Sequence, residues 1–252
     1  MSSQTSSFDL TGDRAGESTV DPLVERLDAL DSTVVSDALD GLHLPAGLGG
    51  LRPAWGTPRF VGRARTVALE GDSGGSPGPH LGTSVVADAR PGDVLVMANG
   101  GRLDVSCWGG ILSLGCVQQG VVGVVADGAC RDVAEAQELG LPVFARGVSP
   151  RTARGRLRQR ATGVPVQVED VTVSEGDLVI ADDSGVVFVP ADCAEEVLAA
   201  AEAIVEREAA ISADIRAGVR IDQAMHDVRL AGHTDNEADA EQVLHQGQEE
   251  GR

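Results

Sequence analysis

The chain has 252 residues, of which 42% are hydrophobic, enough to bury one substantial core, and its formal net charge is −19. This charge disfavours a general binder of nucleic acids or anionic membranes, because long-range repulsion opposes both encounters. All twenty basic residues are arginines. Without a lysine amine, the chain can neither form a Schiff base with a carbonyl substrate nor complete a phosphate-binding loop of the Walker type. A carbon–carbon lyase built on this chain would therefore need a metal ion as its electron sink.

The four cysteines and five histidines are scattered and lack the paired short spacing of a zinc finger or zinc ribbon. No apolar run approaches the roughly 20 residues that span a bilayer. The N-terminal sequence MSSQTSSFDLTGDR has neither a basic start nor an apolar stretch. We therefore expect a cytoplasmic protein with reduced thiols and with neither a membrane nor a nucleic-acid partner.

The two ends of the chain differ in composition from its middle. Residues 1–20 are rich in Ser, Thr, Asp and Gly, and residues 233–252 are acidic and nearly free of large apolar side chains. Such segments bury too little apolar surface to fold by themselves. We expect mobile tails at 1–20 and 233–252 and a single domain at 21–232.

Within that domain, hydrophobic periodicity predicts two short helices, then a strand, and then alternating strands and helices. In chain order, the expected elements are helices at 21–30 and 32–42, strands at 60–70 and 93–98, a helix at 106–119, a strand at 121–126, a helix at 132–139 and a strand at 141–145. Ser32 is a suitable N-cap for the second helix. This alternation is typical of an α/β layer arrangement.

A long helix is expected to begin at Asp192, with Glu195 at the spacing of a capping box. Apolar residues then recur at helical spacing, and Gly218 is a suitable stop. An amphipathic stripe of this kind favours a docking helix or an oligomer contact over a catalytic role.

The stretch from Trp108 to Glu135, WGGILSLGCVQQGVVGVVADGACRDVAE, carries the candidate chemistry. Gly109 and Gly110 stand where a loop turns into a helix, and the first amides of a helix lack intrahelical partners. A carboxylate could therefore be held by the backbone of residues 110–112 (Gly110, Ile111 and Leu112) and be favoured by the helix dipole. On the pattern alone, a tight turn packed against the sheet is the stronger alternative, because glycine pairs before helices are common.

Arg131 and Asp132 follow an apolar strand, and ligands of open α/β sheets bind at the carboxyl ends of strands. The guanidinium could bind a 2-oxo acid, and the carboxylate offers a hard oxygen ligand to Mg²⁺ or Mn²⁺. The alternative, which the pair taken alone favours, is a surface ion pair in which Asp132 caps a helix and Glu135 completes a capping box.

Two other charged clusters favour structural roles. Six arginines lie between residues 146 and 160, at 146, 151, 154, 156, 158 and 160. They could attract an anionic substrate or RNA, yet they lack interleaved aromatic residues, so a solvated loop or an intersubunit ion-pair surface is favoured. Asp182 and Asp183 resemble a metal-binding pair, but a polar β-turn before Gly185 also explains them.

The spacing around the arginine–aspartate pair resembles a known signature. Gly110, twenty intervening residues, Arg131-Asp132 and, after two more residues, Glu135 match the G-x20-R-D-x2-E/D pattern of the RraA-like family. STVVSDALDGLHLPAGLGGLRPAW, RPGDVLVMANGG and GDLVIADDSGVVFVP are similar to further segments of that family. The likeness covers roughly residues 25–220, and spaced agreement is more specific than a short motif.

The resemblance implies an α/β fold with a β/β/α swivelling core, and trimers or hexamers with sites at subunit interfaces. It implies a metal-dependent aldolase that cleaves a 4-hydroxy-2-oxo acid such as 4-hydroxy-4-methyl-2-oxoglutarate to pyruvate and that also decarboxylates oxaloacetate. The backbone from Gly109 to Leu112 and the side chain of Arg131 would bind the oxo acid. Asp132 would hold Mg²⁺ or Mn²⁺, and Arg131 and Asp132 would be the catalytic residues.

One departure concerns proton transfer. Several aldolases of the family carry aspartate where this chain has Gly110, so the acid/base group is not assigned by the resemblance. Glu135 could substitute, although the simpler expectation is that it supports the metal ligands without binding the ion itself, or is an acidic residue at the start of a helix. A different class of function is also open, because the family resembles non-catalytic regulators that bind ribonuclease E. The intact Arg131-Asp132 pair favours the enzyme.

Overall fold

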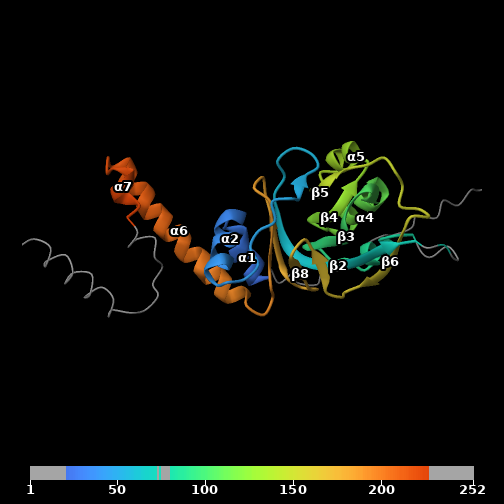
Figure 1. The fold of residues 1–252 in the computed structure, drawn as a ribbon, viewed down its shortest axis with the longest axis horizontal. Coiled ribbons are helices and arrows are strands. Elements are labelled where there is room, and N and C mark those ends of the chain that lie inside the picture. The colour runs from blue at the N-terminus through green and yellow to red at the C-terminus, as the bar shows by residue number, and fades with distance from the viewer. Residues whose placement is uncertain (1–20, 73, 75–79, 227–252) are drawn as a thin grey trace, which may run out of the picture.

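The computed structural model describes residues 21–72, 74 and 80–226 (Figure 1). The segments expected to be mobile tails, 1–20 and 233–252, lie outside the described residues. Within the described part, no helix combines the length and the apolar character needed to cross a membrane.

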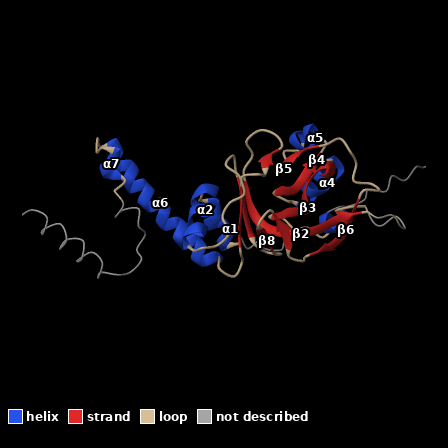
Figure 2. Ribbon diagram, in the orientation of Figure 1, coloured by secondary structure: helices blue, strands red, loops and turns tan. Residues whose placement is uncertain are grey.

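The centre of the fold is a curved, barrel-like mixed sheet of eight strands (Figure 2). Its middle is parallel and consists of β2 (Phe60–Gly71), β3 (Asp93–Trp108), β4 (Gly123–Cys130) and β5 (Val143–Val148). Every residue of β4 is buried, as is usual for a parallel strand covered on both faces. Antiparallel strands complete the sheet: β1 (Arg52–Pro53), β6 (Leu157–Thr162), β9 (Leu178–Ala181) and β10 (Val186–Val189). A separate hairpin joins β7 (Val166–Val168) and β8 (Val171–Val173).

Two groups of helices cover this sheet. One core cluster joins the sheet to α3 (Thr83–Ala87), α4 (Gly110–Gln119) and α5 (Val133–Glu138). Another joins β9 and β10 to α1 (Pro22–Asp28), α2 (Ser32–Gly41) and α6 (Ala194–Arg216). The hairpin β7–β8 packs with a third cluster of buried side chains. The expected α/β class with a long C-terminal helix is confirmed.

The long helix α6 leaves the body of the protein (Figure 1). Its first half packs on α1 and α2 through buried residues such as Val197 and Ala201. Beyond Gly218, the short α7 (Ile221–Ala224) folds back, burying Ala224 and Ile211. Five large apolar side chains of this outer part are exposed: Val205, Ile215, Val219, Ile221 and Met225.

The two short N-terminal helices and the strand at 60–70 are confirmed, but the starts of two later helices differ from expectation. The helix expected at 106–119 begins at Gly110, because Ser106 and Trp108 pair with β4 instead. The helix expected from Asp192 begins at Ala194, and its N-cap, Cys193, makes no side-chain capping bond. The predicted capping box is therefore wrong. The chain before the helix is held instead by Asp177, which accepts from the amide of Ala191 at 3.0 Å.

Ser32 is not the N-cap of α2, because Asp31 holds that position. Instead, the backbone N–H of Ser32 donates to Asp182 Oδ2 at 2.8 Å, and its hydroxyl donates to Asp182 Oδ1 at 2.6 Å. Asp182 also accepts from the amide of Ser184 at 2.9 Å. The aspartate of the polar turn thus caps a helix 150 residues away in sequence, which supports the turn interpretation over a metal pair.

We expect Asp182→Asn to destabilise the protein by about 1–2 kcal/mol at pH 7, because charged helix-cap bonds are lost. Burial alone would raise the pKa of Asp182, but hydrogen bonds from Ser32, Ser184 and Gly185 outweigh it and lower that pKa. A lowered carboxyl pKa adds stability above its ordinary value of 3.8, and this contribution disappears as pH falls through the folded-state pKa. Urea unfolding at pH 7 and pH 3 should therefore show a smaller difference between the two proteins at pH 3. Asp183→Asn, at the exposed neighbouring position, is the control, and an equal loss in both variants would contradict the capping role.

Candidate functional site

The candidate site lies where the ends of two parallel strands meet the starts of two helices. β3 ends at Trp108, which is paired with Cys130 at the end of β4, and the amide of Arg131 donates to the carbonyl oxygen of Trp108 at 3.0 Å. The start of α4 and the residues that lead into α5 therefore lie side by side. The expected convergence of Gly109-Gly110 with Arg131-Asp132 is present in the fold.

Asp132 connects these two segments. Its carboxylate Oδ2 accepts from the amide of Gly110 at 3.0 Å and lies 3.4 Å from Nε of Arg131. Asp132 is the N-cap residue of α5, in the left-handed region at φ 57°, yet its side chain makes no capping bond to that helix. The alternative in which Asp132 and Glu135 form a capping box on α5 is therefore wrong. Asp132 instead satisfies an amide at the N-terminus of the neighbouring α4, where the helix dipole favours a negative charge.

Side chains occupy the space next to the two glycines, so a side chain at either position would displace a neighbour. A Cβ at Gly109 would lie 2.9 Å from Asp132 Oδ2 and 3.2 Å from Arg131 Nε. A Cβ at Gly110 would overlap the carboxylate of Glu135. Glu135 thus fills the volume that a side chain at position 110 would occupy. The close packing expected for the glycine pair is present, whereas the Gly110 amide, expected to help hold a substrate carboxylate, donates to Asp132 instead. Binding of a carboxylate by the amides of Ile111 and Leu112 stays a prediction.

The donors around this point differ in availability. The amide of Gly110 is bonded to Asp132, and the amide of Ser113 donates to Gly109 O at 3.1 Å. The amides of Ile111 and Leu112 belong to the first turn, which has no intrahelical acceptor to offer them. The side chains of Arg131 and Asp132 are each 40% exposed. A small anion approaching from solvent can therefore meet a guanidinium and the start of a helix together.

Two neighbouring residues have structural roles. Trp108 is buried, and its indole N–H donates to Ser113 Oγ at 3.0 Å, so this ring packs beneath the helix start as expected. Cys130 precedes Arg131, and burial raises the pKa of its thiol to about 11. Such a thiol is protonated near neutral pH in the metal-free protein, which disfavours a role for Cys130 as a nucleophile.

The oxygen donors fit a hard divalent cation. Among the described residues, no three His, Cys, Asp or Glu side chains gather into a metal-binding group. Asp132 and Glu135, however, both reach the start of α4. Mg²⁺ is commonly held by one or two carboxylates, with water and substrate oxygens completing its shell, whereas structural zinc prefers four nitrogen or sulfur ligands. The residues present therefore suit Mg²⁺ or Mn²⁺.

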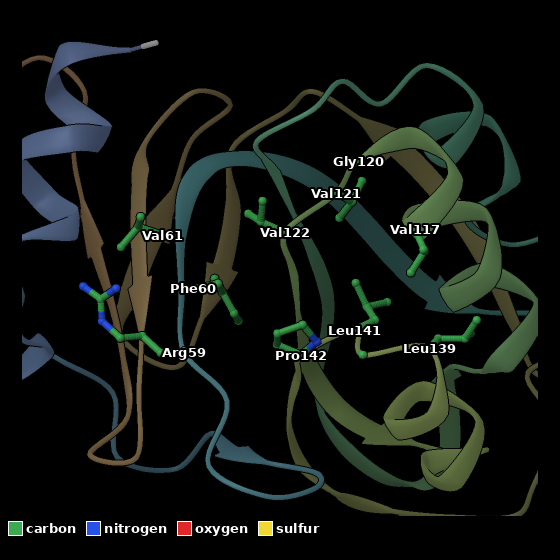
Figure 3. Close-up of a pocket in the computed structure, with 11 residues that line it drawn as sticks. Arg59, Phe60, Val61, Val117, Gly120, Val121, Val122, Leu139, Leu141 and Pro142 are labelled. Carbon is green, nitrogen blue, oxygen red and sulfur yellow. The ribbon is translucent and has the colours of Figure 1, made fainter.

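A large surface depression in the described part of the chain lies elsewhere (Figure 3). It measures about 470 Å³ and is mostly apolar, with Phe60, Val117, Leu141 and Pro142 among its lining residues. Val117 and Gly120 lie at the end of α4, whereas the candidate site lies at its start. Chemistry is expected at the carboxyl ends of the strands, and this depression lies at the opposite end.

The arginine-rich segment divides into two parts. The arginines at 151, 154, 156, 158 and 160 are exposed as expected, but Arg158 and Arg160 lie on β6 rather than in the expected loop. Arg146 differs, because its side chain is only 19% exposed and its Nε lies 2.6 Å from Oδ1 of the buried Asp127. The expectation for Arg146 is therefore corrected. A charged residue inside each of two apolar strands, Asp127 and Arg146, is the sequence signal for this ion pair. The two residues are 19 positions apart, and the sequence does not show that their strands lie side by side.

A family model agrees with these observations. The model for RraA-like proteins (Aldolase/RraA) matches residues 32–188. The chain belongs to the RraA-like family. The RraA-like signature residues Gly110, Arg131, Asp132 and Glu135 are the residues that meet in space.

Individual RraA-like relatives extend this result. A 4-hydroxy-4-methyl-2-oxoglutarate aldolase of Thermus thermophilus is 30% identical over 135 residues, covering 54% of this chain and 78% of the aldolase. Protein DlpA of Legionella pneumophila is 28% identical over 209 residues, covering 83% of this chain. The chain spans about a third (34%) of the length of DlpA. The crystal structure of Streptomyces coelicolor RraAS2, described as an unusual member of the RNase ES inhibitor RraA protein family, superposes with a TM-score of 0.67 at 30% identity, covering 74% of this chain and 93% of that one.

Proposed function

We propose that this protein is a divalent-metal-dependent carbon–carbon lyase that cleaves a 4-hydroxy-2-oxo acid, such as 4-hydroxy-4-methyl-2-oxoglutarate, to pyruvate and a second carbonyl product. Decarboxylation of oxaloacetate, which breaks a bond at the same position relative to the 2-oxo group, is the companion activity. The observation that carries the proposal is the meeting of Arg131, Asp132 and the start of α4.

Each group has a distinct task in this proposal. Arg131 binds the carboxylate of the 2-oxo acid, assisted by the amides of Ile111 and Leu112 and by the dipole of α4. Asp132 holds Mg²⁺ or Mn²⁺, and its bond to Gly110 orients the carboxylate. The bound ion supplies Lewis-acid polarisation of the 2-oxo oxygen. Arg131 adds a fixed positive charge near the oxygen on which negative charge develops. With no lysine in the chain, no competing lysine Schiff-base route exists.

In this proposal, Glu135 carries out the proton transfer of the acid/base step. Its carboxylate fills the space of the missing side chain at position 110, which is aspartate in several aldolases of the family. A carboxylate delivered from α5 can therefore exchange a proton through water at the same place as one carried by the start of α4. Glu135 is in this proposal the acid/base group, and Gly110 is the residue that makes room for it.

The metal requirement is tested by pyruvate release from the oxo acid and from oxaloacetate. We expect EDTA to abolish release and Mg²⁺ or Mn²⁺ to restore it. Asp132→Ala and Arg131→Ala should each lower kcat/KM by about 10²-fold or more, as loss of a charge-stabilising group usually does. Arg154→Ala, at an exposed arginine outside the site, is the matched control. Metal-independent turnover, or wild-type rates in both site variants, would remove the proposal.

The role of Glu135 is tested by a double-mutant cycle. Gly110→Ala places a methyl group in the volume of the Glu135 carboxylate and should push it aside. We expect Gly110→Ala and Glu135→Gln each to lower kcat by about 10²-fold, and the double variant to be no slower than the slower single variant. Glu138→Gln, an exposed carboxylate on the same helix, controls for charge. Multiplying effects in the double variant would mean that Gly110 and Glu135 act separately.

We also propose that the protein assembles as a homotrimer or as a hexamer of two trimers. Support comes from the family resemblance and from apolar side chains that α4 exposes beside the site, with Ile111 81% and Leu114 46% exposed. Light scattering should give three or six times the chain mass. Leu114→Glu should shift the mass toward the monomer, because it puts a charge into an apolar contact, whereas Gln118→Glu on the same helix should leave it unchanged. A wild-type monomer at micromolar concentration would contradict the assembly.

A non-catalytic regulator of a ribonuclease is the second candidate, favoured by the likeness to RraAS2. It ranks lower because a pure interaction protein has no need of Arg131 and Asp132 at a helix start. A pull-down showing tight ribonuclease binding, by a protein that binds neither Mg²⁺ nor pyruvate, would reverse this order.

A further inference from the structure

The regular pairing of the central strands is interrupted just before the candidate site. Between β3 and β4, the register shifts between Ala98 and Arg102, and between β4 and β5 it shifts between Ala126 and Ala129. Asp127 and Gly128 therefore lack regular pairing with β5, whereas Ala129 and Cys130 at the end of β4 pair again with both neighbouring strands. A side-chain interaction at this irregular part adds to the backbone bonds that set the path of β4.

An ion pair between a buried aspartate and a partly buried arginine lies at this interruption. Asp127 is 1% exposed, and its carboxylate lies 2.6 Å from Nε of Arg146 on β5 and accepts from the amide of Gly101 on β3 at 3.3 Å. Nη1 of Arg146 donates to Oε1 of Glu169 at 2.6 Å. One guanidinium thus ties β4 and β5 to the turn between β7 and β8, and one carboxylate ties in β3.

The surroundings show that this arrangement is closely packed. Glu169 lies in the left-handed region at φ 54°, which is uncommon for a residue with a side chain. A Cβ at Gly50 would lie 3.0 Å from Nη1 of Arg146. At Gly128, a Cβ would lie 2.8 Å from Nδ2 of Asn99, a buried side-chain atom without a hydrogen-bond partner among the described residues.

Stability alone is a weak reason to keep such a pair. Removing a charge from water has a large free-energy cost, and apolar residues of the same volume often stabilise a core equally well or better. Directional charged hydrogen bonds do supply a defined geometry, which apolar contacts do not. Catalytic side chains must be held within about 0.5 Å of their working positions, and Asp127 precedes Arg131 by only four residues.

We propose that Asp127 and Arg146 are positioning residues for the site at Arg131 and Asp132, fixing the end of β4 against β3 and β5 where the register of the strands shifts. The pair does not contact the substrate in this account, and its catalytic consequence rests on the function proposed above. The backbone bonds that follow it in the chain, from Arg131 N to Trp108 O at 3.0 Å and from Ser149 N to Cys130 O at 2.9 Å, transmit the placement to the site.

The test compares two buried aspartates in the full-length protein. Asp127→Asn keeps the side-chain shape and removes the charge. Asp93→Asn is the matched control, because Asp93 is also buried, accepts from the amide of Arg90 at 2.8 Å and lies 3.5 Å from Nη1 of Arg65, but it begins β3 at the far end of the strand. Stability is measured for both by urea unfolding, so that activity is compared between proteins that are fully folded.

Two readouts distinguish positioning from a structural role. In kinetics, Asp127→Asn should lower kcat at least tenfold in the folded protein, while Asp93→Asn stays within about threefold of the wild type. In fluorescence, measured on a Trp55→Phe background in which Trp108 is the remaining tryptophan, Asp127→Asn should shift the Trp108 emission and raise its quenching by acrylamide, and Asp93→Asn should not. Asp127→Glu, which keeps the charge, should recover part of both signals.

Arg146→Lys is the second variant in case Asp127→Asn does not fold. It retains a cation but loses the planar fork that reaches Asp127 and Glu169 together, and it should show the same two changes. Wild-type kcat and wild-type Trp108 emission in folded Asp127→Asn or Arg146→Lys protein would overturn the proposal. If the wild type releases no pyruvate, the proposed function fails, and the Trp108 emission still decides whether the pair positions the end of β4.

Discussion

The site depends on one constraint, the parallel pairing of β3 and β4 up to their final residues. Trp108 lies opposite Cys130, and the amide of Arg131 still donates to Trp108. Because the strands are parallel, the segments that follow β3 and β4 leave the sheet at the same edge, and both continue into helices there. A glycine pair and an arginine–aspartate pair that are separated by twenty residues in the chain therefore become neighbours. The bond from Gly110 to Asp132 depends on this pairing.

Local features of the chain were predictable from its sequence, because they depend on neighbours in the chain. Valine-rich runs gave the buried strands, helical spacing gave α1, α2 and α6, and the glycine pair marked the start of α4 within a few residues. The candidate residues were predictable as well, since the strand order of an α/β fold places them at one edge. The family resemblance contributed what periodicity alone could not, namely the choice between catalytic and structural interpretations of Arg131-Asp132.

The remaining hydrogen bonds and ion pairs could not be predicted, because their polar side chains contact residues far away in the chain. Asp182 caps α2 rather than only its own turn, and Asp132 caps α4 rather than α5. Arg146 was grouped with exposed arginines by its sequence neighbourhood, yet it pairs with Asp127 inside the sheet. In each case the sequence offers several residues that could serve as the hydrogen-bond or ion-pair partner. The three-dimensional path of the backbone decides among them, and a single sequence does not contain that path explicitly.

The outer half of α6 affects how the molecule moves in water. A helix of 23 residues is about 35 Å long, and only its first half is packed against the body (Figure 1). The described part of a single copy is consequently elongated, with a helix projecting from a compact body, so it experiences more friction than a sphere of equal mass. Rotation about its long axis is faster than end-over-end tumbling, and no single correlation time describes the reorientation of all its described backbone amides.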